Sequence, residues 1–429
     1  MVIVFLLVTV SVLVAANWYV WRRLFRDTTR TPGAVRRAGA VLIAGGWVLA
    51  VGALVAERAG APFWLQRTLA WPGFLWMALS IYLLLALVVG EAVRPLLRRH
   101  LERRDRARTP AAAEVRQPEP IPAGAPPREA DSAGTPDEIE RTEETEGPRQ
   151  PAPAGPSRRL FVSRVVAGTA AAAAVGTVGY GSYGVLRGPR VKRVTVPLAK
   201  LPRGAHGFRI AVVSDIHLGP VLGRGFAQRV VDTINATQPD LIAVVGDLVD
   251  GSVKDLGPAA APLAQLKARH GAYFVTGNHE YFSGAGQWVE EVRRLGLRPL
   301  ENARTELPFF DLAGVNDVAG EDEGQGPDFG KALGDRDTAR ACVLLAHQPV
   351  QIHDAVEHGV DLQLSGHTHG GQLWPGSLLA AAANPTVAGL ERYGDTQLYV
   401  SRGAGAWGPP TRVGAPSDIT VVELASRQA

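Results

Sequence analysis

Three long stretches near the start of the chain contain no charged residue, and they constrain the fold more than any other feature of the sequence. They run from Val2 to Trp21, from Ala38 to Ala56 and from Thr68 to Gly90. Each is long and apolar enough to cross a lipid bilayer as a helix. Helices buried in a soluble core usually show a polar face, which these stretches lack. We therefore expect residues 1–108 to form a membrane domain with three transmembrane helices.

Arginine is distributed unevenly over the loops of this domain. Between the second and third stretches the arginines are Arg58 and Arg67. The segments after the first and third stretches are richer, and they contain Arg22, Arg23, Arg26, Arg30, Arg36 and Arg37, and Arg94, Arg98, Arg99, Arg103, Arg104, Arg106 and Arg108. Because loops rich in arginine face the cytoplasm, we expect both of these segments on that side of the membrane.

Residues 109–156 have the composition of a linker. They are rich in Pro, Ala, Glu and Gly, and glutamates cluster between Glu138 and Glu146. A segment with so little aliphatic bulk cannot bury a core, so we expect a disordered acidic linker.

The segment 157–190 supports two interpretations. It begins with Ser157-Arg158-Arg159-Leu160-Phe161 and continues as an uncharged run from Val165 to Leu186. It resembles a twin-arginine export signal, which would make the twin-arginine translocase a partner. It also reads as a fourth transmembrane helix. Both interpretations place everything after Leu186 outside the cytoplasm, which predicts a multi-pass protein of the cytoplasmic membrane with an extracytoplasmic domain at residues 191–429.

Charge and cysteine content exclude several functions. The 45 Lys and Arg against 41 Asp and Glu give a net charge of +4, which is weak evidence for a nucleic-acid partner, and we expect none. The single cysteine, Cys342, excludes an intrachain disulfide and a cysteine-based metal cluster. Because it lies within an apolar run, we expect it in the core.

From about Val191 onward, short apolar runs alternate with helical patterns. The predicted strands are Arg209 to Ser214, Leu241 to Val245, Tyr273 to Thr276, Val343 to Ala346, Leu362 to Leu364 and Gln397 to Val400; the predicted helices are Gly225 to Thr237, Ala260 to Arg269, Gln287 to Leu295 and Val350 to Glu357. This alternation indicates an α/β fold with largely parallel strands. Functional groups in such folds gather beyond the carboxyl ends of the strands.

Five of these strands are followed immediately by residues of the types that bind metals. They occur in the segments Asp215-Ile216-His217, Gly246-Asp247-Leu248-Val249-Asp250, Gly277-Asn278-His279-Glu280, His347, and Gly366-His367-Thr368-His369. Oxygen and imidazole ligands without thiolate suit divalent manganese, iron, zinc or cobalt. The three glycines would let the backbone turn sharply into one shared site. Asp250 either orients a ligand or serves as a turn residue.

With these motifs, about 230 residues at the end of the chain resemble the calcineurin-like metallophosphoesterase family. The resemblance implies a four-layer α/β/β/α sandwich with two divalent metal ions as cofactors. Carried over by position, one metal would be bound by Asp215, His217 and His369, the other by Asn278, His347 and His367, and both by Asp247. His279 is similar to the family's histidine that contacts the scissile phosphate or protonates the leaving oxygen. The other histidines, His206, His270, His353 and His358, are expected to be structural or on the surface.

Two later segments are candidates for substrate contacts. Residues 401–412 follow a predicted strand and are similar to a segment in membrane-associated members of the family; Arg402 or Arg412 would bind a second phosphate, and Trp407 would offer an apolar wall. A plain turn-rich loop is the alternative. The apolar residues 380–390 would either dip into lipid or form a small helix packed on the sheet.

These features predict a membrane-anchored phosphohydrolase that cleaves a phosphodiester or pyrophosphate bond. Two cations about 3.5–4 Å apart activate a hydroxide for attack at phosphorus, so no protein nucleophile is needed. The location suggests a lipid-linked or envelope substrate. The alternatives are a non-catalytic sensor or scaffold, which would be expected to lose ligands, and a cytoplasm-facing nucleotide phosphodiesterase, which the arginine distribution opposes.

Overall fold

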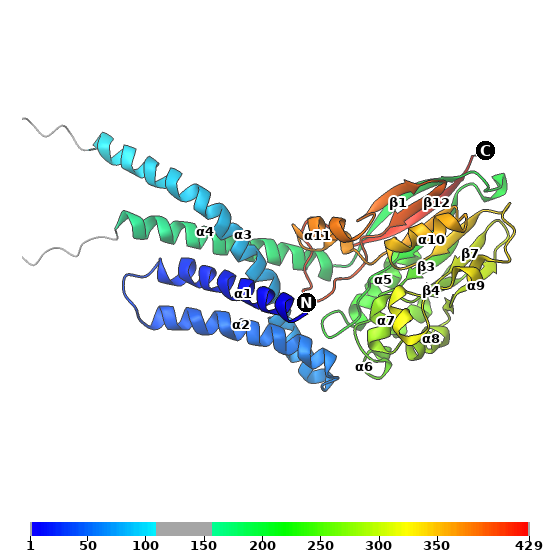
Figure 1. Cartoon of the computed structure of the whole chain (residues 1–429), viewed down its shortest axis with the longest axis horizontal. Coiled ribbons are helices and arrows are strands. Elements are labelled where there is room, and N and C mark those ends of the chain that lie inside the picture. The colour runs from blue at the N-terminus through cyan, green and yellow to red at the C-terminus, as the bar shows by residue number, and fades with distance from the viewer. Residues whose placement is uncertain (1, 109–156, 428–429) are drawn as a thin grey trace, which may run out of the picture.

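The computed structural model of the chain describes residues 2–108 and 157–427. Four long helices extend from one side of a domain built on two β-sheets (Figure 1). The predicted linker, residues 109–156, lies outside the described residues.

The extended helices follow the predicted apolar stretches. They are α1 (Val2–Trp21), α2 (Ala34–Arg58), α3 (Phe63–Arg108) and α4 (Arg158–Leu186). Among the described residues, α2, α3 and α4 are long and apolar enough to cross a membrane. The segment with the paired arginines therefore forms a helix, with Ser157 as its N-cap. The first span, α1, is helical, and its membrane crossing stays a prediction.

Small residues bring α3 and α4 together. Ala78 of α3 and Ala174 of α4 are almost fully buried and pack with Tyr82, Leu83 and Val178. At the far end of the bundle, Arg164 of α4 donates from Nε to the carbonyl of Thr28 at 3.0 Å. The start of α4 and the loop after α1 therefore lie at the end of the bundle away from the two-sheet domain (Figure 1).

Each sheet of the domain has six strands. The first has the order β1 (Arg190–Leu198), β12 (Asp418–Ser426), β2 (Phe208–Val213), β3 (Leu241–Val245), β4 (Ala272–Val275) and β5 (Arg298–Pro299). The second has the order β10 (Gly389–Tyr393), β11 (Thr396–Val400), β9 (Leu362–Ser365), β8 (Cys342–Leu345), β7 (Asp311–Gly314) and β6 (Ala303–Glu306). Most neighbours are parallel; the pairs β12–β2, β10–β11 and β6–β7 are antiparallel.

Alternating side chains along the central strands build three stacked cores. In β3, Leu241, Ala243 and Val245 pack between the two sheets, whereas Ile242 and Val244 face the helices on the other side. Because both faces of β3 are covered, all five of its residues are apolar and buried. The first sheet is covered by α5 (Arg224–Ala236), α6 (Val253–Ala260) and α8 (Ala285–Arg294), and the second by α9 (Phe329–Leu333) and α10 (Ile352–Glu357). The expected four-layer α/β/β/α sandwich is confirmed.

The helix predicted from Ala260 to Arg269 is wrong: α6 ends at Ala260 and a short 3-10 turn covers Ala261–Gln265. Pro262 explains the break, because it has no backbone NH to continue the α-helical hydrogen bonds past Ala260. Cys342 is fully buried in the core under α10, as expected, and burial raises its pKa to about 12.

The first four residues of the apolar insertion belong to a small helix, α11 (Gly376–Ala383), none of whose residues is buried. The last two begin β10, and Leu390 packs against the core between the sheets. Helix α11 lies on the side of the domain that faces the long helices (Figure 1). Nearby, Tyr82 of α3 donates to the carbonyl of Trp374 at 3.0 Å. Ser182 of α4 and Thr411 share a buried hydrogen bond of 2.7 Å. The helical bundle is thus fixed directly to the domain.

Candidate metal centre

The five predicted ligand segments converge at the carboxyl ends of their strands. The residues form three groups whose candidate ligand atoms lie within 4.8 Å of one another; the groups are Asp215, His217 and His369; His217, Asp247 and His279; and Asp247, His347 and His367. Asp247 and His217 each belong to two groups, so the three form one continuous cluster. The cluster is consistent with a site for two metal ions.

An unusual backbone conformation aims these side chains at one point. Five predicted ligands have a positive φ, namely Asp215 (50°), His217 (48°), Asp247 (52°), His367 (72°) and His369 (53°). Residues other than glycine rarely adopt this region, and they keep it only where the surrounding structure holds them there. Such strain gathered on the predicted ligands is typical of a functional site.

The three glycines of the motifs act in two different ways. Gly246 has a φ of +72°, as the expected sharp turn requires. Gly277 and Gly366 do not have a positive φ. A Cβ at Gly366 would lie 2.5 Å from Oδ2 of Asp215, and one at Gly277 would collide with Oδ1 of Asp247. These two glycines are therefore needed for close approach of the carboxylates rather than for a turn.

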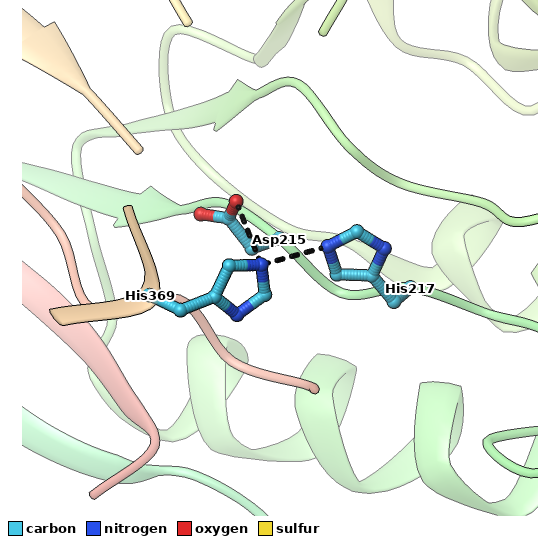
Figure 2. Close-up of side chains that lie close together, drawn as sticks. All are labelled: Asp215, His217 and His369. Atoms are coloured by element: carbon cyan, nitrogen blue, oxygen red, sulfur yellow. Dashed lines mark hydrogen bonds and ion pairs between the residues drawn. The ribbon is translucent and has the colours of Figure 1, made fainter. Parts of the chain in front are cut away.

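One half of the cluster joins the first and last motifs (Figure 2). His217 and His369 approach through their Nε2 atoms at 3.0 Å, and His369 Nε2 lies 3.5 Å from Oδ1 of Asp215. Backbone NH of His367 donates to the same carboxylate oxygen at 3.0 Å. Two imidazole nitrogens and a carboxylate oxygen thus point into one small space, which suits a divalent cation.

The other half gathers around Asp247. His347 Nε2 lies 3.2 Å from Oδ2 of Asp247, and His367 Nδ1 lies 3.0 Å from Oδ1 of Asn278. The Nδ1 atom of His347 donates to the carbonyl of Val245 at 2.8 Å, which leaves its buried Nε2 without a hydrogen-bond partner among the described residues. An outer hydrogen bond of this kind fixes the tautomer of a metal-binding histidine, so the site fits a cation at this position.

Asp250 orients two histidines at once. Its Oδ1 accepts from Nδ1 of His217 at 2.8 Å and from Nδ1 of His279 at 2.7 Å. Burial lowers the pKa of His279, but the hydrogen bond and charge of Asp250 outweigh this effect and raise it to about 9. Asp250 therefore makes the contact expected of a residue that positions a ligand. The protonated ring of His279 can donate from Nε2 to an anionic oxygen.

The surroundings of His367 and His369 favour the neutral form of both imidazole rings. Burial and the neighbouring His347 lower the pKa of His367 to about 4. Burial, His217 and Arg412 lower the pKa of His369 well below its ordinary value. Neutral imidazole is the form that binds metals.

The predicted substrate residues lie in different places. Trp407 is 47% exposed, and its ring is 5.8 Å from that of His279, beside the cluster. Arg412 is buried, and its guanidinium contacts the backbone of His369 at 3.0 Å and Nδ1 of the same residue at 2.9 Å. These contacts indicate that Arg412 positions His369 rather than contacting substrate. Arg402 packs against Gly370. The histidines at positions 206, 270, 353 and 358 belong to none of the three groups.

Sequence reasoning missed Glu280, although it lies within a motif. Its buried carboxylate accepts from the backbone NH of Asp247 at 2.9 Å, of Leu248 at 2.8 Å and of Gly277 at 2.6 Å. It thereby ties the loop after β3 to the loop after β4. The sequence did contain a signal for this role of Glu280, because a glutamate three residues after a helix N-cap, here Gly277, is a capping pattern.

A cavity of 460 Å³ opens over the cluster. Its walls include Asp247, Asn278, His279, His367, His369 and Trp407. Leu54, Glu57 and Arg58 at the end of α2 complete it. Nothing in the sequence pattern connects the end of a membrane helix with a site more than 150 residues later.

The chain is similar to known metallophosphoesterases. The profile of the calcineurin-like phosphoesterase family matches residues 208–371. A transmembrane protein with a metallophosphoesterase domain from Danio rerio is 40% identical over 259 residues, which cover 57% of this chain and 59% of that protein. An uncharacterized metallophosphoesterase from Aquifex aeolicus is 35% identical over 240 residues, covering 55% of this chain and 91% of that protein.

A solved structure of a dimetal phosphatase from Danio rerio superimposes with a TM-score of 0.35 at 11% identity, covering 51% of this chain and 93% of that one. The chain spans between 57% and 66% of the length of the first curated relatives that it matches.

Proposed function

This chain belongs to the calcineurin-like metallophosphoesterase family, and we propose that it is a dinuclear metal-dependent phosphohydrolase that cleaves a phosphodiester or pyrophosphate bond. The observation that carries the proposal is the continuous cluster in which Asp247 and His217 each join two groups of ligand atoms. Asp215, His217 and His369 would hold one cation, Asn278, His347 and His367 would hold the other, and Asp247, which belongs to two of the groups, would contribute to both.

The metals, when bound, supply Lewis acidity and an activated water for an in-line displacement at phosphorus. The residues of the chain supply the rest. Asp250 accepts from Nδ1 of His279 at 2.7 Å, which leaves Nε2 of this cavity-lining ring to donate a hydrogen bond to the phosphate or a proton to the leaving oxygen. Glu280 and Asp250 keep the ligand loops in register.

Substitution of Asp247 tests the activity. Asp247→Ala and His367→Ala should each abolish hydrolysis of a chromogenic phosphodiester and lower the bound metal measured by mass spectrometry. His353→Ala, at an exposed histidine away from the cluster, is the matched control and should change neither quantity. Turnover by Asp247→Ala at the wild-type rate would falsify the site assignment. Metal binding without turnover by the wild-type chain on any phosphoester would favour the sensor or scaffold alternative.

A lipid-linked phosphoester is the substrate class that the surroundings of the site support best. An apolar groove of 680 Å³ lies beside the metal cavity, between Met77 and Ile81 of α3 and Leu378 and Leu379 of α11. His369 and Trp407 line both the groove and the cavity. A phosphate at the ligands and a hydrocarbon chain in the groove can therefore belong to one molecule, with the chain still next to the membrane helices.

Chain-length dependence tests this substrate class. Leu378→Ser combined with Leu379→Ser should raise KM for a long-chain phosphodiester and leave a short-chain diester unchanged, because each buried methylene contributes about 0.8 kcal/mol. Leu96→Ser, at an exposed leucine of α3 outside the groove, is the control. Equal KM values for long and short chains in the wild type would exclude the lipid substrate. A clear preference for nucleotide diesters would support the nucleotide alternative.

The proposed orientation places the catalytic domain outside the cytoplasm, with residues 1–108 and 157–190 in the cytoplasmic membrane. Its support is that the arginines after α1 lie at the end of the bundle opposite the catalytic domain, as the positive-inside rule requires. A reporter fused after Ala429 should behave as extracytoplasmic, and cytoplasmic behaviour would exclude this orientation.

A double substitution tests the export route. Arg158→Lys combined with Arg159→Lys should block export of the domain if the twin-arginine route is used. Normal export of this variant would show that residues 157–190 act as an ordinary fourth transmembrane helix.

A further inference from the structure

The end of α2 reaches into the metal cavity. Leu54, Glu57 and Arg58 line it together with Asn278 and His279. Membrane anchoring alone does not explain why two charged neighbours, Glu57 and Arg58, line a cavity over the ligand cluster. Arg58 is the only lysine or arginine among the residues that line this cavity.

The Arg58 guanidinium is held beside the cluster by an aromatic ring, and Glu57 is the acidic residue next to it in the cavity. It lies 5.4 Å from the ring centre of Phe282, and that ring is 5.6 Å from His279. Within the described ranges, no carboxylate lies within ion-pair distance of Arg58. The arginine therefore keeps its hydrogen-bond donors for a ligand in the cavity.

Packing fixes this end of α2 in place. Gly73 of α3 leaves no room for a side chain, because a Cβ there would lie 2.6 Å from the carbonyl oxygen of Leu49 in α2. Ala53, Ala70 and Phe74 bury one another, and Val221 of the catalytic domain packs against them. The short connection between the helices is closed by the hydrogen bond from Ala61 to Ala56 at 2.9 Å. Arg58 is thus presented by a rigid support rather than by a free loop.

We infer that Arg58 binds a second anionic group of the substrate, one that does not sit on the metals, and that the membrane domain is therefore part of the active site. A guanidinium recognises phosphate or carboxylate through paired hydrogen bonds. The inference rests on the proposed phosphohydrolase activity and narrows its substrates to those with two anionic groups. Arg412 cannot take this role, since its guanidinium is occupied behind His369.

The test compares two p-nitrophenyl phosphodiesters that differ only in whether the alcohol carries a second phosphate. It uses the full chain in detergent, loaded with manganese. Arg58→Ala should lower kcat/KM for the doubly anionic diester about 10- to 100-fold, mainly through KM, because a hydrogen bond to a charged group contributes about 1.5–3 kcal/mol. The loss on the simple diester, which lacks the second anionic group, should be about 10-fold smaller or less. Arg58→Lys should retain part of the discrimination.

Arg67→Ala is the matched control, because Arg67 is an exposed arginine at the same end of the bundle that does not line the cavity. Equal losses on both diesters would show a merely structural role for Arg58 and overturn the inference. Identical kinetics of Arg58→Ala and Arg67→Ala would overturn it as well. Failure of the proposed function has a different signature, since the wild-type chain would then hydrolyse neither diester.

Discussion

The contacts of Asp250 predict that metal affinity depends on this residue. Its Oδ1 accepts from His217 at 2.8 Å and from His279 at 2.7 Å. Asp250→Asn keeps an oxygen acceptor but removes the negative charge that holds both rings in place. We expect metal affinity and kcat to fall about 10- to 100-fold, the usual effect of losing such an outer partner. Calorimetric metal titration of the apoprotein measures the first quantity and steady-state kinetics the second.

The control for this variant is Asp232→Asn, at an exposed position on α5. It should bind metal like the wild type. Unchanged affinity in Asp250→Asn would show that Asp250 serves only the turn before Gly251.

Cys342 gives a prediction about pH. Burial raises its pKa to about 12, whereas a thiol in an unfolded chain titrates near about 8.5. The reactive thiolate is therefore scarce in the folded protein at pH values between these two, and abundant after unfolding. Iodoacetamide at about pH 9 should label the chain slowly under native conditions and rapidly in denaturant. Fast native labelling, measured by mass spectrometry, would contradict the buried position.

The proximity of the seven predicted metal ligands and His279 could be expected from sequence, because their motifs follow apolar strands and parallel strands bring their carboxyl ends to one edge. The residues that support them were harder to predict. Glu280 holds two loops through backbone donors, and Arg412 approaches His369 from behind. Such contacts depend on loop geometry, which the alternation of apolar residues does not encode.

At the level of elements, the loop after β4 depends on a glycine for space. A Cβ at Gly277 would collide with Oδ1 of Asp247. Gly277→Ala should therefore displace the Asp247 carboxylate, lower metal binding and activity at least about 10-fold, and destabilise the fold by about 1–3 kcal/mol. Gly286→Ala, in α8, meets no atom within 4 Å and should leave activity unchanged while keeping or slightly raising stability. Metal content and thermal unfolding distinguish the two variants.

Buried, continuously apolar strands were predicted well, whereas exposed or very short strands were not predicted. β3 has the predicted bounds, Leu241–Val245, because burial on both faces gives an uninterrupted apolar run. β5 has two residues, Arg298–Pro299, and no pattern at that length can identify it. β6 (Ala303–Glu306) is half-exposed and polar, so it also carried no apolar signal. These edge strands form through pairing with neighbours, which is a tertiary effect.

At the scale of the whole molecule, the catalytic domain and the helical bundle share surfaces that the sequence did not predict. The sequence pattern distinguishes the helical region from the two-sheet domain, because apolar runs and an α/β alternation have different periods. It gave no information on how they meet. Tyr82 contacts Trp374, Ser182 contacts Thr411, and the end of α2 borders the cavity. The membrane region is therefore expected to influence catalysis as well as location.

This arrangement predicts that the two halves of the chain hold together without their covalent connection. A protease site inserted within residues 109–156 would yield one fragment with α1 to α3 and another with α4 and the catalytic domain. Because α3 and α4 share the buried cluster of Ala78, Leu83 and Ala174, both fragments should co-purify after cleavage in mild detergent and keep wild-type activity. Gel filtration followed by an assay of the peak measures both properties.

Two glycine variants show whether helix packing is the cause. A Cβ at Gly90 of α3 would lie 2.6 Å from the side chain of Val166 in α4, whereas Gly168 of α4 meets no atom within 4 Å. Gly90→Leu should separate the cleaved fragments, because overpacking forces the helices apart. Gly168→Leu adds the same bulk on an open face and should leave them together. If the fragments separate after cleavage of the chain without either substitution, the prediction is wrong. The covalent linker, and not the α3–α4 contact, would then join α1 to α3 to the rest of the chain.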